Sequence, residues 1–416
     1  MMLRSKPNKL GEQMNPVLAF VVVMLVWTIS DWVAKKTKSL LSSLFVASLI
    51  FLVGFMTGLF PPDLLQASSL LGLAGAVVGF IIVHLGTVIS LDDFKKQWKT
   101  LLIGIATVVG IGVLLVVATL IFGSGMPRVN DYGELVARGR DFMIAGIGAL
   151  SGGTISVLMV QEAALGVGLT TVAAFPVLIA ALQGLIGFPL TSIILRREAA
   201  RLKEDYRAGR LEAPVIEETK EASQGMLPSF LRTTPGTLFS VGIVVLVSIG
   251  INNLTNGVLN TFVVALILGI TLRATGVFKP SVLSGIDAYG LMMLAILIMV
   301  FGPLATLRPA DLLALAWPLV LVFVFGLIGI AAFSAGVGKL LGYSVPMSIA
   351  IGLTSLYGFP GTMILSQEAA KGAGETPEEV AAIEGSILPK MIVAGFSTVT
   401  ITSVVVTGII ASGIGR

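Results

Sequence analysis

The chain of 416 residues contains no cysteine, one histidine and only 12% charged residues. The lack of cysteine excludes disulfides and thiolate metal sites, and the single histidine, His84, excludes a metal centre built from several histidines. An ordinary soluble domain carries about 25% charged residues, so half of the usual solvating charge is missing here. Hydrophobic residues reach 55% and the mean hydropathy is +0.98, which indicates an integral membrane protein.

Long apolar runs occupy most of the sequence, and one of them, 101–122, contains no charged residue. About 20 apolar residues in a helix cross the hydrocarbon core of a bilayer. Four clear spans are predicted in the first half and four in the second, near 16–34, 40–60, 69–91, 100–123, 236–252, 257–277, 285–306 and 312–336. A final span closes each half, near 172–195 and 382–412. Because the first apolar run is too long for a signal peptide, we interpret 1–15 as a tail before the first span.

Three segments of the first half correspond in order to three of the second, which indicates a duplication. The segment 40–60 resembles 258–278, 84–91 resembles 300–307, and 152–164 resembles 358–370, where both members end in Gln-Glu-Ala-Ala. We therefore divide the chain into the N-terminal tail, a first repeat over 16–196, a linker over 197–234 and a second repeat over 235–416. The linker contains many charges of both signs and is predicted to be solvated and partly helical.

Each repeat contains one apolar segment that glycine interrupts, 142–168 in the first and 346–374 in the second. Glycine permits non-helical backbone and proline lacks an N–H, so both residues end helices. Backbone that leaves a helix at membrane depth persists only where protein or a water-filled cavity satisfies its polar groups. Matched interruptions in two halves are the best sequence indication of a transporter's binding site. Glycines that only allow close helix packing are the alternative.

The predicted substrate-binding residues are those of the two interruptions together with one lysine: Ser151, Gly152, Gly153, Thr154, Ser156, Tyr357, Gly358, Phe359, Pro360, Gly361, Thr362 and Lys390. Freed carbonyls and hydroxyls at the interruptions suit a sodium ion, although the sequence does not specify its ligands. The predicted ion-coupling residues are Gln161, Glu162, Ser366, Gln367 and Glu368.

The three charged residues among these candidates, Glu162, Glu368 and Lys390, also have a simpler interpretation. A carboxylate inside a span is a functional hypothesis by default. Glu162 and Glu368 could instead be solvated at the ends of their segments or cap a neighbouring helix. Lys390 could neutralise a substrate carboxylate, pair with an acidic residue, or extend its ammonium to the membrane surface.

The duplicated units, with Ser-Gly-Gly-Thr at 151–154 and Gly-Phe-Pro-Gly at 358–361, resemble the bacterial sodium/glutamate symporters and the related 2-hydroxycarboxylate transporters. The symporters have a glycine-histidine-glycine core at the first interruption, where this sequence has Gly153-Thr154-Ile155. The resemblance implies an all-α fold of two inverted repeats, each with about five spans and one re-entrant hairpin. It also implies sodium coupling, a homodimer, and elevator-like movement of the hairpin-bearing domain.

The sequence thus predicts a secondary transporter, not an enzyme, that carries a small organic anion (an amino acid or a carboxylate) together with sodium and needs no cofactor. A proton-coupled carrier or exporter, the membrane subunit of a sodium-pumping decarboxylase and a channel remain alternatives. We expect a multi-pass protein of the cell (inner) membrane that does not bind nucleic acid. The excess of Lys and Arg predicts that the linker is cytoplasmic. Ten spans would place the termini outside, and twelve would place them inside.

Overall fold

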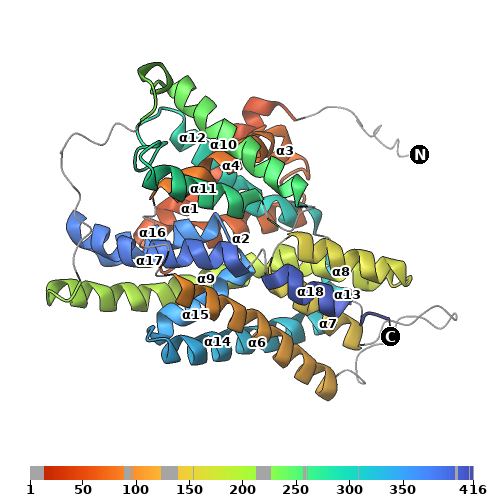
Figure 1. Cartoon of the computed structure of the whole chain (residues 1–416). Coiled ribbons are helices and arrows are strands. Elements are labelled where there is room, and N and C mark those ends of the chain that lie inside the picture. The colour runs from red at the N-terminus through yellow and green to blue at the C-terminus, as the bar shows by residue number, and fades with distance from the viewer. Residues whose placement is uncertain are drawn as a thin grey trace, which may run out of the picture.

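The computed structural model describes residues 14–88, 95, 97–122, 139–152, 154–211, 226–255, 259, 261–307, 309–398, 402–411 and 413–415, and the account below concerns these residues (Figure 1). Their secondary structure is helical, and no strand occurs among them. The first half contains α1 (Pro16–Lys36), α2 (Ser43–Met56), α3 (Leu64–Ala67), α4 (Leu70–Val88), α6 (Trp98–Phe122), α7 (Gly139–Leu150), α8 (Thr154–Gly166) and α9 (Thr170–Arg207). The second half contains η1 (Ser229–Leu231), α10 (Thr234–Leu254), α11 (Thr261–Ala274), α12 (Tyr289–Ile298), η2 (Met299–Thr306), α13 (Pro309–Ala314), α14 (Ala316–Leu340), α15 (Val345–Leu353), η3 (Thr354–Leu356), α16 (Gly361–Ala373), α17 (Pro377–Ser397) and α18 (Ser403–Ala411).

Seven helical segments of the described chain are long and apolar enough to cross a membrane: α1, α4, α6, α9, α10, α12 with η2, and α14. Several large apolar side chains of α6 face outward, among them Val109, Val116 and Leu120. In water such a face would be costly, whereas in a bilayer lipid covers it. The predicted all-α membrane protein is therefore confirmed at this level.

The helices lie within or near the predicted spans, but α2 and α11 have 14 residues each, fewer than the predicted spans 40–60 and 257–277. Helix α9 continues to Arg207, so the first part of the predicted linker is helical and joined to the last span of the first half. The final span 382–412 is divided into α17 and α18. Part of the tail (1–13) and part of the linker (212–225) lie outside the described residues.

Polar side chains next to proline determine where several helices begin. Asn15 accepts hydrogen bonds from the backbone N–H groups of Val17 and Leu18, and proline occupies the start of α1. A similar combination, with a hydroxyl in place of the amide at the N-cap and an early proline, begins α10, α15 and α17, through Thr233, Ser344 and Thr376. Side-chain oxygens satisfy the free N–H groups of a first turn, and proline there needs no partner.

The helices pack as two groups, each with members from both halves (Figure 1). The α4 group consists of α1–α4 and α10–α12 with η2, and Figure 1 shows it in the upper part of the molecule. The α14 group consists of α6–α9 and α14–α18 and lies below it. A duplication predicts this arrangement, since corresponding helices of the two halves join the same group. The repeat relationship itself remains a prediction from sequence.

Glycines allow the closest helix crossing in each group. A Cβ on Gly329 of α14 would lie 2.4 Å from the carbonyl oxygen of Gly110 on α6, and a Cβ on Gly110 would lie 2.6 Å from the carbonyl oxygen of Gly329. In the α4 group, a Cβ on Gly86 would lie 2.4 Å from Leu266 O, and one on Gly269 would lie 2.4 Å from Val83 O. Small residues bring membrane helices into backbone contact and so increase their van der Waals packing.

The crossing of α6 and α14 makes a prediction about stability. Gly329→Ala should force these helices apart and destabilise the protein by about 1–3 kcal/mol, the usual cost of overpacking. Gly336→Ala is the matched control on the same helix, because a Cβ there meets nothing within 4 Å. Thermal unfolding in detergent measures both variants. Equal melting temperatures for the two would contradict the crossing.

Ion pairs connect the end of α9 to the turn between α16 and α17. Lys203 lies 2.5 Å from Glu375, and Arg207 lies 2.7 Å from both Glu375 and Glu379. Hydrogen bonds donated first by Lys203 and then by Arg207 lower the pKa of Glu375 from 4.5 to about 2. Glu375 is exposed, so solvent screens these pairs and their contribution to stability is small.

The lowered pKa of Glu375 makes stability depend on pH. Because folding lowers this pKa, the pairs stabilise the fold fully above pH 4.5, and the contribution is lost as the pH falls from 4.5 towards 2. Glu375→Gln should therefore melt below the wild type at pH 7, and the difference should shrink below pH 4.5. Glu204→Gln, a nearby exposed glutamate on α9, is the control and should change little at any pH. A difference for Glu375→Gln that is constant with pH would be inconsistent with these pairs.

Candidate functional site

A cavity of about 680 Å³ lies between the α4 group and the α14 group. The α4 group lines it through Ser48 on α2, Val78 and Ile82 on α4, Phe262 on α11, and residues of α12 and η2. The α14 group contributes residues of α8 and α9, the interruption between η3 and α16, and Phe396 of α17. The cavity is therefore bounded by helices from both groups and both halves of the chain.

The second interruption forms one wall of this cavity. After η3 the backbone turns through Gly358 at φ 56°, a left-handed conformation that favours glycine, and α16 begins at Gly361. The predicted residues Tyr357, Gly358, Phe359 and Pro360 all line the cavity, as does Ser355, which was not predicted. Gly361 and Thr362 lie just behind them and are buried.

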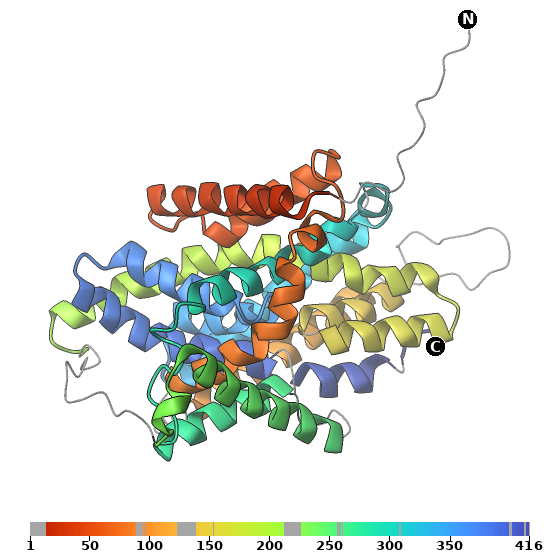
Figure 2. The same cartoon turned by 90° about the horizontal axis from the view of Figure 1, so that it is seen from above.

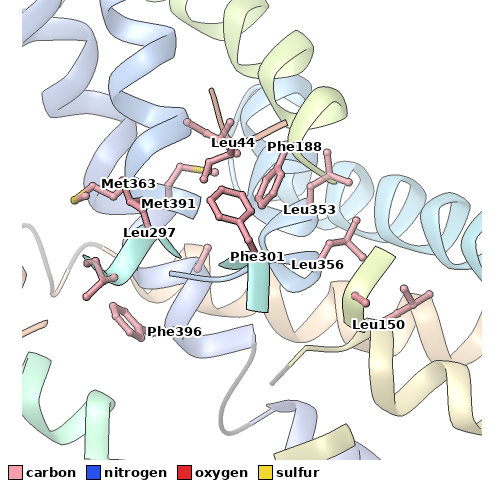
Figure 3. Packing of buried hydrophobic residues seen from close by; sticks show 14 of the residues in the cluster. Leu44, Leu150, Phe188, Leu297, Phe301, Leu353, Leu356, Met363, Met391 and Phe396 are labelled. Carbon is pink, nitrogen blue, oxygen red and sulfur yellow. The ribbon is translucent and has the colours of Figure 1, made fainter. Parts of the chain in front are cut away.

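Aromatic contacts and two close glycines hold this wall in place. The Tyr357 hydroxyl donates to Thr191 Oγ1 at 3.0 Å, and its ring centroid lies 5.3 Å from that of Phe188. Phe359 stacks on Phe396 at 5.6 Å. Figure 3 shows Phe188, Leu356 and Phe396, all cavity-lining residues, among the buried apolar side chains.

Two glycines, one from each half of the chain, flank the same wall. A Cβ on Gly187 of α9 would lie 2.9 Å from Tyr357 Cδ1, and one on Gly395 of α17 would lie 2.7 Å from Thr362 Cγ2. Neither position has room for a larger residue unless the interrupted segment moves. The α9 and α17 backbones thus approach the second interruption closely from different sides.

The polar groups of the cavity are uncharged. Its polar side chains are those of Ser48, Gln161, Gln183, Ser355 and Tyr357, and no Asp, Glu, Lys or Arg is among the described residues that line it. Gln183 Oε1 and Ser355 Oγ are buried and have no hydrogen-bond partner within the described part of the chain. A buried polar atom without a partner costs about 1–3 kcal/mol, and a bound polar ligand would remove that cost. The cavity suits a small ligand that dipoles recognise.

The first interruption lies beside the cavity and does not line it. Helix α7 ends at Leu150, Gly152 has φ 90°, and α8 begins at Thr154. Ser151 Oγ donates to Ile147 O, so this hydroxyl already has a partner. Gly153 lies outside the described residues, and the side chain of Thr154 is not described. Of the first segment, only Val157, Leu158 and Gln161 on α8 reach the cavity.

Two hydroxyls at corresponding positions resemble each other in their surroundings. Ser156 lies in the first turn of α8 and Thr362 in the first turn of α16. Both hydroxyl oxygens are buried, and neither has a hydrogen-bond partner among the described residues. Ser366 differs, because its hydroxyl donates to Thr362 O. Ser156 and Thr362 are therefore the predicted residues whose hydroxyls are best placed to bind an ion or a small ligand next to the helix interruptions.

The two predicted glutamates occupy different environments. Glu162 is exposed on α8. On α16, Glu368 accepts hydrogen bonds from the backbone N–H of Ser43, at 3.0 Å, and from the Ser43 hydroxyl, so it caps the first turn of α2. Its Oε2 is buried without a partner in the described structure, and its backbone carbonyl accepts from Ser39. Glu368 thus connects an interrupted segment to the α4 group.

Other predicted residues lie away from the cavity. Gln367 donates to Glu384 at 3.2 Å. Lys390 lines a second cavity and donates to Ser386 O at 2.7 Å. No group of three His, Asp or Glu residues in the described ranges is placed to hold a metal ion.

The sequence contained a signal for one residue that was missed. Gln183 is the only amide side chain in the apolar run 171–195, and a polar residue inside a span marks a candidate site. Ser355 gave no comparable signal, since serine is common in membrane helices. Its position is fixed by the turn before Gly358.

The capping contact of Glu368 can be tested by its removal. Glu368→Ala should destabilise the protein by about 1–3 kcal/mol, because Ser43 loses its buried acceptor. Glu162→Ala removes the corresponding exposed carboxylate and should leave the melting temperature in detergent unchanged. Glu368→Gln, which keeps one acceptor oxygen, should lie between. Equal effects of the two alanine variants would refute the cap.

No protein-family model matches the sequence, and a search of curated proteins finds no match. The features of this chain that bear on function are the cavity, the two helix interruptions and the arrangement of the helix groups.

Proposed function

We propose that this chain is a secondary active transporter that carries a small organic anion, an amino acid or a carboxylate, together with sodium. One observation carries the proposal: an uncharged cavity lies between two groups of helices, and an interrupted helix forms its wall. Transporters place their substrates at interrupted helices between structural repeats. The α14 group, which contains both interruptions, would move past the α4 group as an elevator, and the α4 group would form the contact of a homodimer.

We propose ten spans, which are the seven long helical segments together with α2, α11 and α17. Helices α7 and α8 extend to the right of Figure 1, α15 and α16 extend to the left, and Figure 2 repeats this arrangement. These helices have 12, 13, 9 and 13 residues. At 1.5 Å per residue each is shorter than the hydrocarbon core of about 30 Å. We propose that each pair is a re-entrant hairpin and that the two hairpins enter from opposite membrane faces.

The anion would be recognised by dipoles. The N-terminus of α16 follows Pro360 at the cavity wall, and the partial positive charge of a helix N-terminus attracts a carboxylate. The amides of Gln161 and Gln183 and the hydroxyl of Ser355 can bind its polar atoms. Since no cationic side chain is among the described residues that line the cavity, a cotransported sodium ion would supply the positive charge, and Ser156 and Thr362 are its candidate ligands.

Proton coupling is the second candidate, and one observation favours it. Glu368 is a carboxylate with a buried, unpartnered oxygen, placed where an interrupted segment meets α2 of the other group. Protonation and deprotonation of Glu368 during transport would change the strength of its contact with Ser43 on α2.

The topology follows from the same proposal. The positive-inside rule places the linker and the end of α9 in the cytoplasm, with the protein in the cell membrane. With ten spans, both termini would then lie outside.

Uptake into proteoliposomes tests the proposal. An inward sodium gradient should drive accumulation of at least one labelled amino acid or small carboxylate, and a protonophore should not abolish it. Gln161→Leu and Gln183→Leu each remove a polar contact of about 1–3 kcal/mol, so uptake at low substrate should fall roughly five- to a hundredfold. Gln66→Leu, an exposed glutamine on α3, is the control.

Two results would reject parts of this proposal. Uptake that is equally fast with potassium and is abolished by the protonophore would replace sodium with proton coupling. Unchanged uptake in both cavity variants would show that the cavity is not the binding site.

A further inference from the structure

A second cavity, of about 360 Å³, lies at one end of the α14 group. Four parts of the chain line it: Trp98 and Lys99 at the start of α6, Glu198 and Arg201 on α9, the segment 342–344 with Met347 of α15, and Lys390 on α17. None of these residues lines the cavity between the two groups. It is therefore a separate site.

Cations outnumber anions in this cavity. Its charged lining residues are Lys99, Arg201 and Lys390 against the single carboxylate of Glu198. The Glu198 side chain is only 3% exposed and is fully bound: Arg201 Nη2 donates to it at 2.5 Å, Arg201 Nε at 3.2 Å, and the Ser344 hydroxyl at 2.6 Å. The hydrogen bond and charge of Glu198 raise the pKa of Arg201 above its usual value, so the arginine stays charged. Arg201 and Glu198 thus compensate each other.

The two lysines bind only neutral groups. Lys99 Nζ donates to Leu341 O at 3.0 Å, and Lys390 Nζ donates to Ser386 O at 2.7 Å and to Ser386 Oγ at 3.2 Å. Each ammonium also lies near an aromatic face, Lys99 at 6.0 Å from Trp98 and Lys390 at 5.9 Å from Tyr343. Neither forms an ion pair with any described carboxylate. Their positive charge is therefore available to an anion in the cavity.

Helix α15 adds to the positive potential. Ser344 caps its first turn by accepting from Met347 N at 3.1 Å, and both residues line the cavity. A helix N-terminus carries a partial positive charge. Two lysines and a helix N-terminus are the groups with which proteins bind phosphate.

We propose that this second cavity binds a phosphate group, with Lys99 and Lys390 as its principal cationic contacts. The phosphate could belong to a phospholipid headgroup or to a soluble phosphate compound. Trp98 is exposed at the rim, as expected where a membrane-facing site meets the headgroup region. Because the lining comes from α6, α9, α15 and α17, a bound phosphate would hold four parts of the α14 group together.

Two binding measurements on the purified full-length protein distinguish the sources. In detergent, the melting temperature is measured with increasing inorganic phosphate against sodium chloride at the same ionic strength, because salt screens charge nonspecifically. In nanodiscs, native mass spectrometry counts retained phosphatidylglycerol against phosphatidylcholine. Stabilisation by phosphate identifies a soluble ligand, and preferential retention of phosphatidylglycerol identifies a lipid headgroup.

Variants assign the binding to this cavity. Lys390→Met and Lys99→Met should each weaken binding about tenfold, which corresponds to about 1.4 kcal/mol per charge-assisted contact. Lys390→Arg keeps the charge and should largely retain binding, which guards against a loss caused by misfolding. Lys371→Met, an exposed lysine on α16, is the matched control and should bind as the wild type does.

Three results would overturn the proposal. They are no specific effect of phosphate or phosphatidylglycerol on the wild type, equal losses in the Lys371 and Lys390 variants, and unchanged binding in both cavity lysine variants. None of these measurements involves transport, so the proposal stands or falls separately from the proposed function.

Discussion

Hydrocarbon cannot satisfy backbone hydrogen bonds, and this constraint governs the whole molecule. A continuous helix satisfies its own N–H and C=O groups, and the two turns keep only part of this pairing: Gly152 N donates to Ala149 O and Gly358 N donates to Thr354 O. Both turns lie in buried surroundings in the α14 group, and helices α9 and α17 approach the second one closely through Gly187 and Gly395. The interruption can exist because other helices enclose it, and the enclosure leaves room for a cavity on one side.

The helices and their interruptions were predictable from sequence because their causes are local. Apolar runs of sufficient length form helices in a membrane, and Gly152, Gly358 and Pro360 end them. The N-cap residues before proline were equally local signals. The duplication remains a prediction from sequence.

The site was only partly predictable, because its composition depends on packing between distant segments. Gln183 and Ser355 reach the cavity through the positions of α9 and η3, which no local pattern specifies. The corresponding residues Glu162 and Glu368 differ for the same reason: α2 begins beside one of them and not beside the other. Lys390 faces Glu198 and Arg201 in the second cavity because α17 packs beside α9. The transport mechanism, the coupling ion and the topology remain predictions.

Helix α9 is one continuous element of 38 residues, about 57 Å long at 1.5 Å per residue. Along it lie Gln183 at the first cavity, Gly187 against the second interruption, Glu198 at the second cavity and Arg207 in the ion pairs with Glu375. These four regions therefore all contact the same helix. An axial displacement of α9 would change all four contacts at once. Binding in one cavity and the geometry of the other regions are therefore coupled through α9. Pro176 and Pro189, inside the helix, are the points at which α9 can bend.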